Sequence, residues 1–338
     1  MRRKILVLAA FCSFVTLASP IDEAMKEAIR HGAMARICYR VIDDEGVPVS
    51  NATAHVWFSS YARHQDDADW LVSTGSNGMF VVEHRTNESL DCGFDKEGYY
   101  HSSDQILFRD RNDVSIKVKD GKWQPYGETR MVVLKKIKKP TAMSVADKRG
   151  RRGYPGAGDW VGYDLAKQDW VSPGGNGVYA DMKIRFVEQR FNGRDFARTM
   201  EVSFEDIPYG GAYLMDSDEY SEFETSYAVN TNASFASRFK YEFKHKGREL
   251  VRDELKKGQY LVFRTRTETY SDGTLKSAHY GVIMGNWKFF ERYGMSISKI
   301  LFNPTPNDTN LEDAETARLS RLGYKQRMDF ERSRKEMP

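Results

Sequence analysis

Along most of the chain, apolar residues alternate with polar ones, which is the pattern of β-strands that bury one face. Near the N-terminus the apolar positions are Ile37-Tyr39-Val41 and then Ala52-Ala54-Val56-Phe58. Later the same period returns at Met182-Ile184-Phe186, Met200-Val202-Phe204 and Phe239-Tyr241-Phe243. Shorter strand-like segments lie between these groups, at 89–94, 105–108, 114–118 and 130–134. The spacing predicts an all-β protein.

Turn residues punctuate the alternation and predict β-hairpins. Asn77-Gly78 is expected to join a strand at 71–74 to one at 79–83, and Asp272-Gly273 to join 259–270 to 274–283. Asn192-Gly193 marks a further turn after the strand at 182–186. Asn-Gly and Asp-Gly favour such turns because both residues tolerate positive φ.

Short helices are expected to flank the strands. Ser19 and Pro20 are a helix-start signal, and Ile21, Met25 and Ile29 then recur on one face, which predicts a short helix within 19–33. At the other end, residues 311–338 predict a charged helical tail. Residues 250–257 fit either a helical turn or a loop.

The first residues predict a secretory signal peptide. Residues 2–4 are basic and precede an apolar run at 5–17, which is roughly a dozen residues and too short for a bilayer core of ~30 Å. The small residues Thr16 and Ala18 predict cleavage after Ala18, so that 1–18 is removed. We therefore expect a secreted or periplasmic protein with no membrane insertion after cleavage.

Removing this segment changes the charge argument. The formal balance is 51 − 48 = +3, and Arg2, Arg3 and Lys4 account for all of it. The mature chain is then close to neutral, which gives no reason to expect a nucleic acid as partner. About 320 residues remain, which is more than one ordinary core holds and is natural for two domains.

Three stretches carry a resemblance to a known family. They are VIDDEGVPVSNA at 41–52, TGSNGMF at 74–80 and KEGYY at 96–100. Together they resemble carboxypeptidase regulatory-like domains, which have the transthyretin-like fold. The resemblance implies a Greek-key β-sandwich over residues 34–136 and implies no activity.

The peptidase that gives this family its name is not expected here. A zinc carboxypeptidase needs a His-x-x-Glu pair and a distant His as metal ligands. None of the seven histidines is followed by Glu at the third position.

The chain beyond this sandwich divides into a linker and a second unit. Residues 137–158 are rich in Lys, Arg and Gly and predict an exposed linker. A second, larger β-sandwich-like domain is expected at 159–310. Its strings GYDL at 162–165, DWVSP at 169–173 and NPTPNDTNL at 303–311 resemble recurrent strings of uncharacterised exported bacterial proteins. That likeness implies a shared architecture and no activity.

Two cysteines remain after cleavage. Export favours a bridge between Cys38 and Cys92, which in the chain-entropy model would contribute roughly 4 kcal/mol. The alternation argues against it, because Cys38 shares the polar face of its strand whereas Cys92 lies between the apolar positions Leu90 and Phe94. Residues on opposite faces of a sandwich cannot meet. Both alternatives stay open.

The most unusual segment repeats Asp-Trp-Val. Asp159 and Trp160 begin the first copy, and Asp169 and Trp170 begin the second, ten residues further on among glycines and tyrosines. Exposed indole rings beside carboxylates suit sugar binding, so these four residues are the candidate ligand-binding site. The alternative is that the tryptophans fill the core of the second domain or the domain junction.

Metal and cofactor sites are not expected. The acidic runs at 216–222 and 66–69 offer oxygen ligands for Ca²⁺, but they lack the glycine and spacing of an EF-hand loop and fit solvated loops better. His279 has no partner at ligand spacing. The motifs of serine hydrolases, zinc peptidases and nucleotide-binding proteins do not occur in the sequence.

These observations favour an exported, non-catalytic binding or envelope-associated protein. Its expected partner is an extracellular glycan or an envelope protein. The alternative is a glycan-acting hydrolase that uses carboxylates of the second domain. Such a carboxylate pair is defined by its separation in space, of roughly 5 to 9 Å, which a sequence does not reveal.

Overall fold

The computed structural model describes residues 23–60, 67–108, 117–146, 152–253, 255–256, 258–285, 287–290, 294–297 and 299–322, with single positions at 326 and 329. Over these residues the protein is mostly β, with sheets that are largely antiparallel, as the alternation predicted. The expected signal peptide and half of the expected charged tail lie outside the described residues. Within the described part of the chain, no helix is both long and apolar enough to cross a bilayer.

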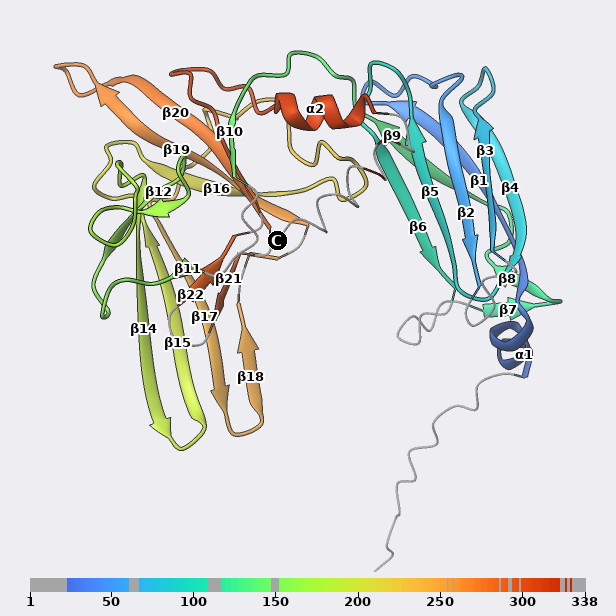
Figure 1. The fold of residues 1–338 in the computed structure, drawn as a ribbon, viewed down its shortest axis with the longest axis horizontal. Coiled ribbons are helices and arrows are strands. Elements are labelled where there is room, and N and C mark those ends of the chain that lie inside the picture. The colour runs from blue at the N-terminus through green and yellow to red at the C-terminus, as the bar shows by residue number, and fades with distance from the viewer. Residues whose placement is uncertain are drawn as a thin grey trace, which may run out of the picture.

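The first lobe is a β-sandwich with one short helix at its edge (Figure 1). One sheet has the order β4-β1-β8-β7, with β9 added parallel to β1, and the other has the order β3-β2-β5-β6. The elements are α1 (Glu23–His31), β1 (Ala33–Asp43), β2 (Thr53–Ser59), β3 (Ala68–Ser73), β4 (Met79–Thr86), β5 (Ser89–Asp95), β6 (Ser102–Leu107), β7 (Lys117–Lys119), β8 (Lys122–Gln124) and β9 (Glu128–Leu134).

The second lobe contains a five-stranded sheet, β10-β23-β20-β19-β16, a six-stranded sheet, β13-β12-β14-β15-β17-β18, and a small sheet, β11-β22-β21. The elements are β10 (Ser144–Ala146), β11 (Arg152–Gly153), β12 (Val161–Asp164), β13 (Asp169–Trp170), β14 (Met182–Asn192), β15 (Asp195–Ser203), β16 (Gly211–Asp216), β17 (Arg238–Lys246), β18 (Glu249–Arg252), β19 (Gln259–Thr269), β20 (Leu275–Met284), β21 (Lys288–Phe290), β22 (Gly294–Ser296), β23 (Ile300–Phe302) and α2 (Ala314–Ser320).

The larger core of the second lobe lies between its two main sheets. Ile184 and Met200 of the six-stranded sheet join one buried cluster with Phe263 and Ile283 of the five-stranded sheet. The opposite face of β19 and β20 is also covered, because Val262 belongs to a second cluster with residues of the loops, including Val229 and Leu311. The undecided segment 250–257 begins as strand, since β18 pairs with β17.

The predicted hairpin at 71–83 is wrong, because its two strands belong to different sheets of the tertiary structure. β3 pairs with β2 whereas β4 pairs with β1, so the turn at Asn77-Gly78 joins the two sheets of the sandwich. Gly78 is required there because its φ is +72° and an added Cβ would lie 2.4 Å from the carbonyl oxygen of Val41. The other two turns join paired strands, β14 with β15 and β19 with β20, as predicted.

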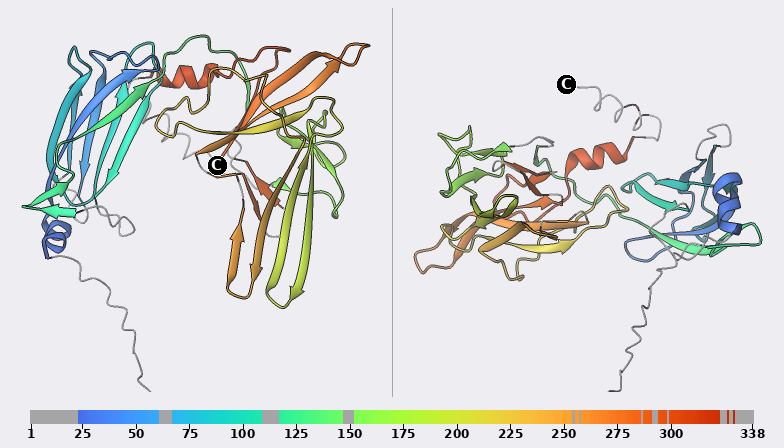
Figure 2. Two further views of the ribbon diagram at one scale, coloured as in Figure 1. Left: turned by 180° about the vertical axis from the view of Figure 1, so that it is seen from behind. Right: turned by 90° about the horizontal axis from the view of Figure 1, so that it is seen from below.

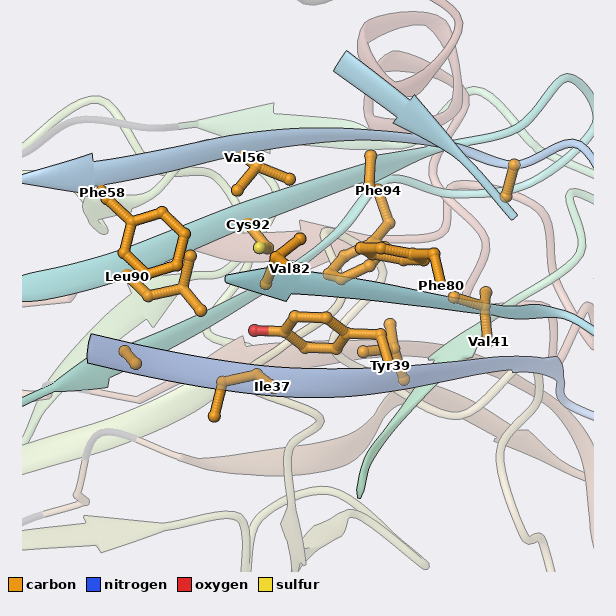
Figure 3. Packing of buried hydrophobic residues seen from close by; sticks show 14 of the residues in the cluster. Ile37, Tyr39, Val41, Val56, Phe58, Phe80, Val82, Leu90, Cys92 and Phe94 are labelled. Carbon is orange, nitrogen blue, oxygen red and sulfur yellow. The ribbon is translucent and has the colours of Figure 1, made fainter. Parts of the chain in front are cut away.

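The core of the first lobe encloses a polar group (Figure 3). Tyr39 lies between Phe80 and Phe94, with ring centroids 5.2 and 5.3 Å away, and its hydroxyl donates to Asp104 over 3.0 Å. The Asp104 carboxylate also accepts two bonds from the Arg130 guanidinium, of 2.6 and 2.7 Å. The buried carboxylate therefore has the bidentate partner that a charge in this position needs.

The two cysteines are free, and they face opposite sides of the sandwich as the alternation indicated. Cys38 lies on the outer face of β1 and is partly exposed, whereas Cys92 of β5 is buried beside Tyr39. Burial raises the pKa of the Cys92 thiol to about 12, so this sulfur stays protonated and unreactive at neutral pH.

This difference in exposure predicts the labelling pattern. A thiol reagent should modify one cysteine in the native protein at pH 7.5, and two after denaturation without a reductant, as counted by mass spectrometry. Cys38→Ser should abolish the native reaction, and Cys92→Ser should leave it unchanged. A denatured protein that accepts no label would contradict the free thiols of the structure.

The two lobes meet around a buried glutamate. Glu312 precedes α2 and is 1% exposed. Its Oε1 accepts bonds from the Tyr100 hydroxyl (3.1 Å) and the Lys138 amide (2.7 Å), and its Oε2 accepts one from the Lys139 amide (2.6 Å). This one carboxylate, in the residue before α2, thus bonds to the first β-sandwich and to the connecting chain. In both views of Figure 2, α2 lies between the two lobes.

The described part of the connecting chain is half-buried or exposed, and contacts of its side chains tie it to both lobes. The Lys136 ammonium lies 2.9 Å from Asp43, and that of Lys138 lies 2.8 Å from Asp44. Lys138 also lies 3.8 Å from the ring centroid of Tyr227, a residue of the second lobe. β10 then pairs with β23 of the second lobe, so the described part of this segment is bonded on both sides.

The junction should depend on the Glu312 carboxylate. Glu312→Ala leaves a buried hydroxyl and two partly buried amides without their acceptor, so we expect a loss of about 3 kcal/mol in the free energy of unfolding by urea. Proteolysis within 137–146 should also become faster. Glu315→Ala on the exposed side of α2 is the control, because its pair with Arg318 should contribute less than about 1 kcal/mol. Equal effects of the two variants would contradict the role of Glu312.

Candidate functional site

The repeated Asp-Trp-Val segment does not form one exposed surface. Trp170 of β13 is 3% exposed and belongs to the main core of the second lobe. Its ring meets the rings of Tyr154 and Tyr163 edge to face, and its indole N–H donates to the carbonyl of Gly153 over 2.7 Å. No face of this indole is open to a ligand, so the core alternative holds for Trp170.

The other three residues of the predicted site each make different contacts. Trp160 is half-buried, and the Arg185 guanidinium lies 4.8 Å from its ring centroid. Asp159 is exposed, and its carbonyl accepts a bond from the Tyr154 hydroxyl. The Asp169 carboxylate accepts the amides of Trp170 (2.9 Å) and Asn176 (3.1 Å), so it holds the glycine-rich turn after β13.

Two carboxylates of the second lobe do converge, but on an arginine. Asp164 and Asp181 are each 1% exposed, and the Arg266 guanidinium bonds to both, at 3.1 and 2.8 Å. Although burial opposes ionisation of Asp164, four amides and Arg266 hold the pKa of this carboxyl below its usual range. A glycosidase general acid needs the opposite shift, so this cluster is suited to holding the loop between β12 and β14.

The predicted metal candidates have other contacts where the structure describes them. Among the described residues, no group of three or more His, Cys, Asp or Glu side chains is placed to hold a metal ion. In the acidic run at 216–222, Asp218 lies 3.2 Å from Lys135 and Glu222 accepts a bond from Ser320. His279 stacks on Phe302 and lies 3.2 Å from the carbonyl of Asn303. Asp66 lies outside the described residues.

An exposed tryptophan between two carboxylates lies on the first lobe, on the outer face of the sheet β3-β2-β5-β6. Successive side chains of a strand alternate between faces, so burying Val56 and Phe58 turns Trp57 outward. Trp57 is 43% exposed. Across the sheet it lies directly opposite Asp69 of β3 and Asp91 of β5. We call the outer-face residues Thr53, His55, Trp57, Asp69, Leu71, Asp91, Asp95 and Gln105 the Trp57 face.

Hydrogen bonds fix both carboxylates beside the indole. Asp91 accepts from Gln105 Nε2 (2.5 Å) and from the Ser89 hydroxyl (2.7 Å). The Asp69 carboxylate lies 2.6 Å from His55 Nε2. A carboxylate has room for about four hydrogen bonds, so these contacts leave acceptor capacity on each. The residues are held in place before any ligand arrives, which lowers the entropy lost on binding.

The side chains of this face are of the types that suit contact with a sugar ring. An exposed indole offers a flat apolar surface, and carboxylate oxygens on either side accept hydrogen bonds from hydroxyl groups. Leu71, which is directly opposite His55, extends the apolar part. The Asp-Trp-Val repeat of the second lobe also places aspartates beside tryptophans in sequence, but there the strand turns Trp170 inward.

Sequence reasoning missed Trp57 although a signal was present. The apolar alternation at Ala54, Val56 and Phe58 leaves the intervening positions to solvent, and a tryptophan at such a position is unusual. The sequence contains no signal that places Asp69 and Asp91 beside Trp57, because that arrangement follows from the pairing of separate strands.

No protein-family model and no curated protein matches the chain. Among solved structures it is similar to 3-chlorocatechol 1,2-dioxygenase from Rhodococcus opacus 1CP, with 16% identity, a TM-score of 0.25, and 31% of this chain and 61% of that one covered. It is also similar to hydroxyquinol 1,2-dioxygenase from Pseudomonas putida DLL-E4, with 15% identity, a TM-score of 0.24, and 31% and 57% covered. The chain thus spans little more than half of these structures, and nothing about their activity is transferred to it.

The burial of the two tryptophans in the repeat predicts unequal effects on stability. Trp170→Ala should lower the free energy of unfolding by about 3 to 5 kcal/mol, because it empties a large buried volume and removes the bond to Gly153. Trp160→Ala, which removes a half-buried ring, should have a much smaller effect. Urea unfolding followed by circular dichroism measures both, and a mild effect of Trp170→Ala would show that the indole is not a core residue.

Proposed function

We propose that this protein is an exported, non-catalytic binding protein that holds a polysaccharide chain on the Trp57 face of its first lobe. The observation that carries the proposal is the position of Trp57, a partly exposed indole set between the carboxylates of Asp69 and Asp91 on neighbouring strands. This combination matches a sugar ring, which has an apolar face and a polar rim.

The hydrolase alternative receives less support from the same geometry. Both Asp164 and Asp181 are bonded to Arg266, and the lowered pKa of Asp164 keeps this group ionised at neutral pH. On the Trp57 face the carboxylates flank an indole that occupies the space between them. A reacting glycosidic bond would need that space.

The affinity is expected to be weak and distributed over several contacts. One aromatic ring stacked on a sugar contributes about 1 kcal/mol, and a hydrogen bond to a charged acceptor contributes a comparable amount. Useful retention then requires a polymer that repeats the contact along its length, as in multivalent binding.

Affinity electrophoresis in native gels containing xylan, galactomannan or hydroxyethylcellulose tests the proposal. We expect at least one polymer to retard the protein and Trp57→Ala to weaken its binding about fivefold, equivalent to about 1 kcal/mol. Trp160→Ala is the matched control, because Trp160 is also a half-buried tryptophan and lies on the other lobe. The proposal fails if no polymer retards the protein, or if Trp57→Ala behaves like the wild type.

A further inference from the structure

A cleft of about 760 Å³ lies where the first lobe meets the end of α2. One wall comes from the start of β2 and the loop after β5, and the other comes from Ser320, Arg321 and Leu322. The volume lies within the range of roughly 300 to 1,000 Å³ that is usual for ligand sites. Polar and apolar surface contribute about equally to the lining.

The cleft shares Thr53 and Asp95 with the Trp57 face. Thr53 and Asp95 lie directly opposite each other on β2 and β5, and both line the cleft. Thr53 is four residues before Trp57 on the same strand, so both side chains project from the same face. At about 3.3 Å per residue the two positions are roughly 13 Å apart, which is the scale of an oligosaccharide and not of one sugar.

The charges of the cleft favour a neutral ligand. Lys96 and Arg321 line it together with Asp95 and Glu97, so that formal charges of both signs are balanced. Asp95 is also bonded to His101 at 2.9 Å. The remaining polar groups are the side chains of Asn51, Thr53, Tyr99 and Ser320. Hydroxyl groups can both donate to and accept from such a set, whereas an anion would face two carboxylates.

We infer that the cleft is a second subsite for the same chain, and that a neutral polysaccharide runs along β2 from Trp57 into the space between the lobes. This inference rests on the proposed function. It assigns Arg321 as a ligand contact from the second lobe. The ligand then touches both lobes, and the position of α2, set by Glu312 and by the bond from Ser320 to Glu222, decides where the subsite lies.

A length series of oligosaccharides, cut from the polymer that retards the wild-type protein, tests the inference. We expect affinity by titration calorimetry to rise with length until a chain reaches from Trp57 to the cleft. Arg321→Ala should weaken binding of the long members about tenfold and leave the short members unchanged, because it removes two or three hydrogen bonds at the far subsite only. Trp57→Ala should weaken every member.

The matched control is Arg318→Ala, which removes the same side chain one turn earlier on α2, where it is paired with Glu315 outside the cleft. If the Arg321→Ala variant binds all lengths like the wild type while the Trp57→Ala variant binds them more weakly, the second subsite is refuted and the proposed binding at Trp57 is retained. If Trp57→Ala binds every length like the wild type, the proposed function itself is refuted. Slower proteolysis within 137–146 in the presence of the longest oligosaccharide is expected as well, since that ligand contacts both lobes.

Discussion

The arrangement of the two lobes depends on one buried carboxylate. Glu312 accepts three hydrogen bonds, from a tyrosine of the first sandwich and from two successive amides of the connecting chain. A buried charge is tolerated only when hydrogen bonds replace its water, so the partners of Glu312 must stay in place for the protein to remain folded as it is. The segment that carries Glu312 leads directly into α2, and Asp313 caps that helix by accepting from the Thr316 amide.

The lysines around this carboxylate strengthen the same junction. The Lys136 ammonium holds the pKa of Asp43 below its usual range, with further help from the amides of Val47 and Glu45. A lowered pKa in the folded state means that this contribution is present at neutral pH and is lost only as the pH falls below about 4. Lys136 and Lys138 thus belong to the junction, because their ammonium groups pair with Asp43 and Asp44 of the first lobe.

The sequence predicted the class of fold and much of the local structure, because these follow from short-range patterns. Alternation placed Tyr39 inside, Cys38 outside and Cys92 in the core. It argued against a bridge without deciding the matter, and both thiols are free. The sequence-based prediction was wrong where a local turn signal connects strands of different sheets. Asn77-Gly78 is a turn, yet it joins two sheets. The strand before it, β3, pairs with β2, whereas Gly78 and the strand after it, β4, lie against β1, which contains Val41.

The exposure of a tryptophan also depends on distant structure. Trp57 and Trp170 both have aspartates close by, but their directions differ, and direction is set by which face of the strand meets a core. β13 pairs with β12 and turns Trp170 toward Tyr163, whereas β2 buries Val56 and Phe58 and leaves Trp57 to solvent. Counting alternate positions outward from the buried ones identifies Trp57. The partners of Trp57, in contrast, depend on strand pairing across the sheet, and the wall of the adjoining cleft depends on Glu312, some 250 residues further along the chain.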